Sequence, residues 1–168
     1  IAKNFFYNKI TNILEAIGDV KYSSKINNTI ITSNKAIYLK NDEKIYTSGN
    51  SKASNENHTI TASSLEYDKI NNIFKAKKDA VINDLEKNTT IYADEIIYLK
   101  NEEKVYTLGK TKALIENKYK FNSENVSYYR NLGELISQKK SSIEDDSGNI
   151  YKLETFMYNI NKELLKGK

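Results

Sequence analysis

Few side chains of this sequence combine residue types and positions that could support chemistry. His58 is the single histidine, and histidine can act as a general base or a metal ligand near neutral pH. It stands in the polar stretch 55–59, which is typical of a turn, so we expect a solvated side chain and no catalytic base. Glu144, Asp145 and Asp146 could bind a cation, but the spaced oxygens of a calcium loop do not follow. We therefore expect an exposed acidic turn there.

Other arrangements for catalysis or cofactor binding are missing from the sequence. No nucleophile stands beside a base, and there is no glycine-rich phosphate-binding loop. Cysteine is absent, which excludes disulfides and thiolate metal centres. We predict a protein that is not an enzyme and that needs no cofactor.

The net charge of +4 comes almost entirely from lysine, because Arg130 is the only arginine. Recognition of bases and phosphates favours arginine, so we expect no nucleic-acid partner. The excess of Lys, Asn, Ile and Tyr is interpreted mainly as a bias toward AT-rich codons.

Length and composition favour one folded domain over residues 1–168. The 39% hydrophobic content and thirteen tyrosines argue against disorder. No apolar run approaches the about 20 residues that span a bilayer. The sequence starts at Ile1 without a signal peptide, and its last residues, 164–168, stop inside a repeat, so we expect a fragment of a longer chain.

An internal repeat predicts the elements that position these side chains. In its first motif a large residue is followed by a small one two positions later, an apolar one after five and a tyrosine after seven, as in Ile60, Ala62, Leu65 and Tyr67. Further copies occupy 31–38, 91–98, 121–128 and 151–158, and a truncated copy precedes them. The anchor tyrosines recur every 29 to 31 residues: Tyr7, Tyr38, Tyr67, Tyr98, Tyr128 and Tyr158.

A second motif begins seven residues after each anchor tyrosine and reads apolar, x, small, x, Gly. Residues 45–49 and 105–109 follow it closely, whereas Lys78 and Lys139 replace the glycine in two copies. We expect the backbone to bend less tightly at these lysines. Alternation with period two and Asn-rich clusters between the motifs predict two strands of roughly ten residues and two short turns in each unit of about 30 residues.

One segment also shows helical spacing. Ile10, Ile13, Leu14 and Ile17 follow i, i+3, i+4, i+7, but the stripe covers only about two turns and overlaps the repeat. We predict a strand here, with a short helix as the alternative.

The first motif changes parity within each copy. Ile31 and Ser33 share one face of a regular strand, whereas Ala36 and Tyr38 fall on the opposite face. A bulge or bend between the two pairs would bring all four to one face. Because the offset recurs, the bends should stack in register and curve the sheet. The predicted fold class is all-β: a twisted, open roll of stacked antiparallel strands.

The repeats resemble the OstA-like, or LptA-like, lipopolysaccharide transport domain, whose units read A-D-x-x-x-Y, a short turn, then apolar-x-A-x-G-x-V. The copy that matches best runs from Ala93 through Tyr98 and the turn 101–103 to Val105 and Thr111. The resemblance covers the chain from about Tyr7 to Gly167. It implies a twisted β-jellyroll, open along one side, that holds the acyl chains of lipopolysaccharide and passes the lipid across the periplasm of a Gram-negative bacterium toward the outer membrane.

The same resemblance implies partners. They are lipopolysaccharide and other β-jellyroll domains of this transport type, which would join by edge-strand addition. The ends of the sequence favour the periplasmic N-terminal domain of the outer-membrane assembly protein LptD, which would add its membrane barrel as a partner. The partner edge is then expected around Ile10, Val20 and Tyr22.

The apolar positions of the two motifs are the candidate lipid-binding residues. They are Ile31, Ile45, Leu65, Phe74, Ile91, Ile96, Val105, Phe121, Val126 and Leu135. The same residues could instead fill a closed core. The alternative function is therefore a structural β-solenoid or adhesin-like repeat without a ligand. An enzyme on a β-helix scaffold would need a charged cluster on one face, which the repeats do not show.

Overall fold

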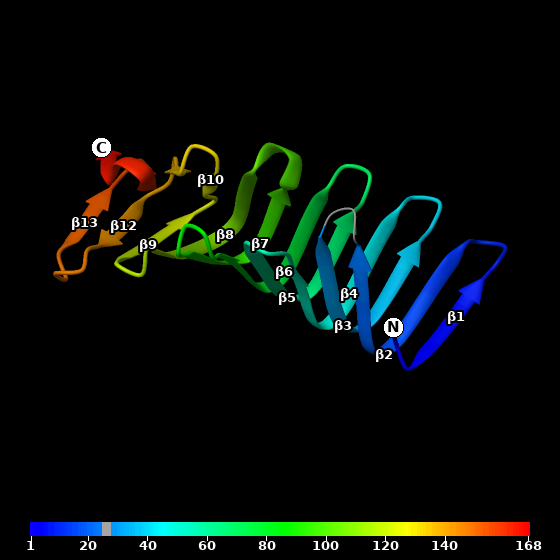
Figure 1. Cartoon of the computed structure of the whole chain (residues 1–168). Helices are drawn as coiled ribbons and strands as arrows, with labels where there is room; N and C mark the ends of the chain where they lie inside the picture. Colours follow the sequence, from blue (N-terminus) through cyan, green and yellow to red (C-terminus); the bar gives the residue numbers. More distant parts are fainter. Residues whose placement is uncertain (25–27) are drawn as a thin grey trace.

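The computed structural model describes residues 1–24 and 28–168, and within them fifteen strands form one antiparallel sheet (Figure 1). The first strand, β1 (Asn4–Asn8), is short, and the long strands are β2 (Ile13–Ser24), β3 (Thr29–Leu39), β4 (Lys44–Ser54), β5 (His58–Asp68), β6 (Ile73–Asp84), β7 (Thr89–Leu99) and β8 (Lys104–Ile115). Shorter strands follow: β9 (Tyr119–Glu124), β10 (Ser127–Tyr129), β11 (Glu134–Ser137), β12 (Ser141–Glu144), β13 (Ile150–Leu153), β14 (Phe156–Asn159) and β15 (Leu164–Gly167). Two single 3₁₀ turns are η1 (Lys100–Glu102) and η2 (Ile160–Lys162).

The prediction of an all-β roll of antiparallel strands is confirmed. Strands follow one another in the sheet in chain order from β1 to β8, as the short turns between the motifs require. The residues with helical spacing, from Ile13 onward, belong to β2, so the strand interpretation is correct. In the described part of the chain, no helix is long and apolar enough to cross a membrane.

A bulge bends each long strand near its middle. In β5, His58, Ile60 and Ala62 are buried, and after the bulge the buried positions are Leu65 and Tyr67. The pairing of β5 with β6 shifts register between Thr61 and Ser64, and all neighbouring pairs from β2/β3 to β7/β8 shift at the corresponding place. The change of parity in the sequence therefore corresponds to a real bulge.

The bends divide the sheet into two arms that face each other. The first arm contains 20–24, 29–33, 51–54, 58–62, 80–84, 89–93 and 111–115 with β9, β12 and β13. The second arm contains β1, 13–17, 35–39, 44–48, 64–68, 73–77, 95–99 and 104–108 with β10, β11, β14 and β15. We call the line of bends the corner and the free ends of the arms the mouth.

Aromatic pairs show that the arms pack on each other. Phe121 of β9 stacks on Phe156 of β14 with ring centroids 4.1 Å apart, and Tyr119 lies 5.6 Å from Tyr158. β9 and β14 are on different arms and do not pair in the sheet. The core therefore lies between the arms, where the inward faces of the two half-strands meet.

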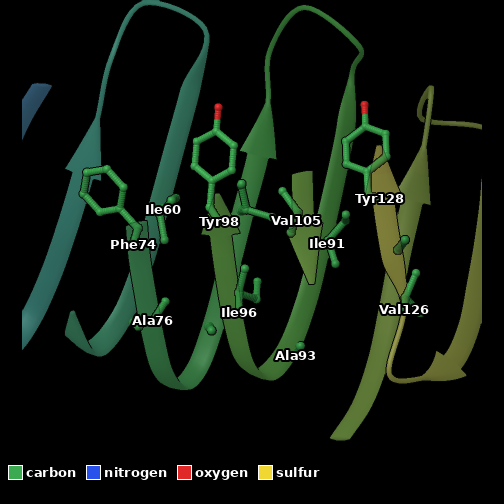
Figure 2. Packing of buried hydrophobic residues seen from close by; sticks show 14 of the residues in the cluster. Ile60, Phe74, Ala76, Ile91, Ala93, Ile96, Tyr98, Val105, Val126 and Tyr128 are labelled. Atoms are coloured by element: carbon green, nitrogen blue, oxygen red, sulfur yellow. The ribbon is translucent and has the colours of Figure 1, made fainter. Parts of the chain in front are cut away.

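The inward side chains become smaller from the mouth toward the corner. Figure 2 shows Phe74, Tyr98 and Tyr128 in a row, whereas Ala76 and Ala93 lie nearer the bends. Because the arms converge at the corner, only small side chains fit there, which explains the small position of both sequence motifs.

Hydroxyl groups at the corner satisfy backbone groups that the bulges release from the ladder. Thr107 Oγ1 accepts the N–H of Val126 at 2.8 Å, and Thr47 Oγ1 accepts the N–H of Leu65 at 3.2 Å. A buried N–H without a partner costs about 1–3 kcal/mol, so threonine at these small positions has a definite structural role.

Paired left-handed residues form the corner in β2, β4 and β6. Gly49 and Asn50 have φ of 76° and 50°, and Lys78 and Asp79 have φ of 62° and 52°. The expectation of a looser bend at Lys78 is wrong, because the lysine adopts the conformation of the glycine it replaces. Lys139 has no left-handed conformation and lies between β11 and β12, where the strand is interrupted instead.

Lys78→Gly is expected to stabilise the protein by about 1 kcal/mol, because an L-residue in the left-handed region pays a steric cost that glycine avoids. Urea unfolding followed by circular dichroism measures the change. The matched control is Lys77→Gly on the same exposed stretch, where φ is not positive and glycine should destabilise the strand. Equal effects of the two substitutions would refute strain at Lys78.

Candidate functional site: the interior and its mouth

The ten candidate lipid-binding residues lie in one buried cluster between the arms. Each is less than 5% exposed, and together they span the roll from β3 to β11: Ile31, Ile45, Leu65, Phe74, Ile91, Ile96, Val105, Phe121, Val126 and Leu135. The structure therefore brings all of them together on the inward faces. They pack against one another in this closed conformation, so contact with a ligand would require the arms to part.

The interior is less tightly filled near the N-terminal end of the roll. A cavity of about 170 Å³ lies between the arms there, and its wall is almost entirely apolar. Its lining includes Phe5 of β1, Leu14 and Val20 of β2, Tyr38 of β3 and Ile45 of β4. Ile45 also belongs to the buried cluster, so this cavity adjoins the core.

Two of the three predicted partner-edge residues line this cavity. Val20 and Tyr22 line it from β2, and Ile10 is 94% exposed in the turn between β1 and β2. β1 pairs along the outer side of β2, and the N–H of Lys21 donates to the carbonyl oxygen of Ile1. At the N-terminal end of the described sheet the outermost strand is thus β1, whose Phe6 is 58% exposed, and an edge role for β2 stays a prediction.

Charged side chains meet at the mouth in the middle of the roll. Arg130, which follows β10 on the second arm, places Nε 2.6 Å from Asp84 Oδ2 at the end of β6 on the first arm. Its Nη2 lies 3.0 Å from Glu86 Oε2, and its Nη1 pairs with Glu103. The hydroxyl of Tyr128 also donates to Asp84, at 3.3 Å. One carboxylate on the first arm is thus bound by two residues of the second.

The expectation that His58 is a solvated turn residue is wrong. His58 is 5% exposed, because β5 begins at this residue and its side chain points inward with that of Ile60. Its ring lies 5.7 Å from that of Tyr98, and its Nε2 lies 3.8 Å from Asp84 Oδ2. Among the described residues, Nε2 has no hydrogen-bond partner.

The electrostatics of the mouth favour the ionised forms of the ion pair. Burial alone would raise the pKa of Asp84, but its contacts with His58 and Arg130 hold that pKa well below the ordinary value. Burial would lower the pKa of Arg130, and the hydrogen bond and charge of Asp84 raise it instead. Burial, with the charge of Glu103, raises the pKa of Tyr98 to about 12. Burial also raises the pKa of Tyr128. Tyr98 and Tyr128 therefore both remain neutral hydroxyls at neutral pH.

Sequence reasoning missed Asp84, Arg130 and Tyr128 as a group. A signal for Asp84 exists, because Ala80 and Ile82 put it on the buried parity of β6, where a carboxylate needs a partner. The expected acidic turn is found in part: Asp145 accepts backbone N–H groups from Ser147 and Asn149, whereas Glu144 ends β12 and pairs with Lys120. In residues 1–24 and 28–168, no group of three or more His, Asp or Glu side chains could hold a metal ion.

Comparisons with known proteins identify the fold. No family model matches the chain, and no curated protein matches its sequence. Solved structures that resemble it include LptH, the LptA-homologous periplasmic component of the lipopolysaccharide transport device from Pseudomonas aeruginosa. The likeness has a TM-score of 0.56 at 15% identity and covers 60% of this chain and 75% of the other. The chain therefore has the LptA-like fold, an antiparallel sheet rolled into a twisted β-jellyroll.

Proposed function

We propose that this protein binds the acyl chains of lipopolysaccharide between its two arms and passes the lipid along the periplasm toward the outer membrane. The observation that carries the proposal is the continuous apolar interior, which runs from the cavity at Ile45 through the buried cluster to Leu135. Each CH₂ buried in such an interior contributes about 0.8 kcal/mol, so acyl chains need no polar site to bind. The likeness to a periplasmic component of lipopolysaccharide transport supports this ligand and this compartment.

The proposed partners follow from the same reasoning. They are lipopolysaccharide and other domains of the LptA-like fold, joined through a sheet edge whose N–H and C=O groups are free to pair. In one form of this proposal, the chain is the periplasmic domain that precedes the membrane barrel of LptD.

A structural repeat without a ligand is the second candidate. The observation in its favour is the closed packing of the ten interior residues, which resembles an ordinary core. It does not account for the apolar cavity near β1, since a purely structural core gains stability from being filled.

Photo-crosslinking to lipid A separates the two candidates. The photoreactive amino acid p-benzoylphenylalanine at Tyr38, which lines the cavity, is expected to capture lipid A. The same group at Tyr92, which is 47% exposed on β7, should not. The two positions exchange one aromatic ring for another, so the substitutions are matched. Equal capture at both positions, or none at Tyr38, would contradict the proposed function.

A further inference from the structure

The only arginine and the only histidine of the chain meet at one carboxylate oxygen. Asp84 Oδ2 lies 2.6 Å from Arg130 Nε and 3.8 Å from His58 Nε2, although Arg130 is 46 residues away in the sequence. The side chains of Asp84 and Arg130 are 3% and 9% exposed. This pair therefore differs from the exposed lysine pairs elsewhere, such as Lys3 with Asp19.

The contact crosses the mouth between the arms. Asp84 ends β6 and Glu86 follows it on the first arm, whereas Arg130 belongs to a turn of the second arm, as does its third partner, Glu103. A second crossing lies beside it: Lys87 Nζ donates to Asn161 Oδ1 at 3.3 Å, and Asn161 Nδ2 donates to the carbonyl oxygen of Leu132 at 3.2 Å. The turn after β6 is thus tied to the turn after β10 by polar contacts.

Arms that are joined by an ion pair separate more readily than arms that are joined by apolar packing. A buried ion pair adds little net stability over well-packed apolar side chains, because desolvation offsets the Coulomb attraction. Its groups can, however, exchange partners for water when the surfaces separate, and its geometry fixes one register on closing. An ionic contact at the mouth therefore suits arms that part and return.

Packing beside the ion pair is incomplete. A space of about 20 Å³ lies beside His58, the neighbour of Asp84, and Ile60, Phe74 and Tyr98 also line it. The buried His58 Nε2, which has no hydrogen-bond partner in the described part of the chain, belongs to a residue on this wall. Packing on the His58 side of the ion pair is therefore not complete.

We propose that the Asp84–Arg130 ion pair is a latch that holds the two arms together in the middle of the roll, and that its release widens the mouth and admits a lipid to the buried cluster. The admission of lipid rests on the proposed function. The separation of the arms does not, since it concerns the protein alone.

Spin labels on the two turns measure the separation of the arms. Leu85 and Leu132 are 58% and 51% exposed, and the native chain has no cysteine, so Leu85→Cys and Leu132→Cys take the only labels. Asp84→Asn with Arg130→Gln removes both charges of the latch and leaves no unpaired buried charge. This double variant is expected to broaden the label–label distance distribution toward longer distances.

The control removes an ion pair that lies within one arm. Lys120→Gln with Glu144→Gln breaks a pair between β9 and β12, with a separation of 2.8 Å, and should leave the distribution unchanged. Circular dichroism confirms that each variant is folded. A latch variant whose distribution matches that of the unaltered labelled protein would overturn the proposal.

Lipid A uptake then tests the consequence of opening. The latch variant is expected to take up lipid A about tenfold faster, which corresponds to an activation free energy lower by about 1.4 kcal/mol. A bis-maleimide bridge between the two introduced cysteines should slow uptake in the same variant, even if the loss of charge weakens the fold. Unchanged uptake in both forms would overturn the link between latch and lipid. If the unaltered protein binds no lipid A, the proposed function fails, whereas the label distances still decide whether the latch holds the arms.

Discussion

Arg130→Ala is expected to lower the free energy of unfolding by about 3–5 kcal/mol, because it leaves the carboxylate of Asp84 buried without a cation. The side chain of Asp84 is 3% exposed, so water cannot replace the guanidinium without opening the mouth. Urea unfolding measures the loss. Lys120→Ala, which breaks the exposed pair with Glu144, is the control and should cost about 0.2–1 kcal/mol.

The double variant Arg130→Ala with Asp84→Ala should be more stable than Arg130→Ala alone, since the unpaired charge is gone. The effect of Arg130→Ala should also depend on pH. In the native protein the pKa of Asp84 is lowered, so its stabilising contribution is present above the unfolded pKa of about 4 and is lost as the pH falls through the folded pKa. Without Arg130, burial dominates and the folded pKa rises, so acid should shrink the difference between variant and native protein. A difference that is constant from about pH 7 to about pH 3 would show that Asp84 is not the cause.

The sequence was sufficient to predict strands β2 to β8 and their bend, whereas the expectation of strands of roughly ten residues is wrong for β9 to β15, which have three to six residues each. Alternation in the two motifs determines which residues face inward, and the change of parity between Ala62 and Leu65 can be accommodated only by an extra residue in the strand. The small residues near the corner follow from the same pattern. These features are local, so the sequence of each repeat predicts them independently.

The closure of the arms could not be predicted from the repeat. The twist of the sheet and the angle between the arms determine which residues of the two arms meet. Neither quantity produces a periodic pattern in the sequence. Asp84 meets Arg130 about one and a half repeats further along the chain. His58 was misplaced for a related reason: its polar neighbours suggested a turn, whereas its parity with Ile60 places it inside. The interior residues were predictable individually, but their closed packing is a property of both arms together.

Packing across the arms should matter most where the sheet no longer connects them. From β9 onward the bent strands are interrupted, so β9, β12 and β13 on one arm share no continuous strand with β10, β11 and β14 on the other. Side chains then hold the arms together. Phe121 of β9 is 1% exposed and stacks on Phe156 of β14 at 4.1 Å, which makes it the central aromatic contact of this region.

Phe121→Ala is therefore expected to destabilise the protein by about 3–5 kcal/mol, through lost burial and the cavity left between the arms. The amides of β12 and β13 should lose protection from hydrogen exchange before those of β5 and β6, because the latter lie in continuous bent strands. Leu108→Ala, at a position 45% exposed on β8, is the matched control and should stay within about 0.5 kcal/mol of the unaltered protein. A loss below about 1 kcal/mol for Phe121→Ala would mean that the arms close without this stack. Uniform loss of protection along the whole roll would mean instead that the C-terminal strands unfold together with the bent ones.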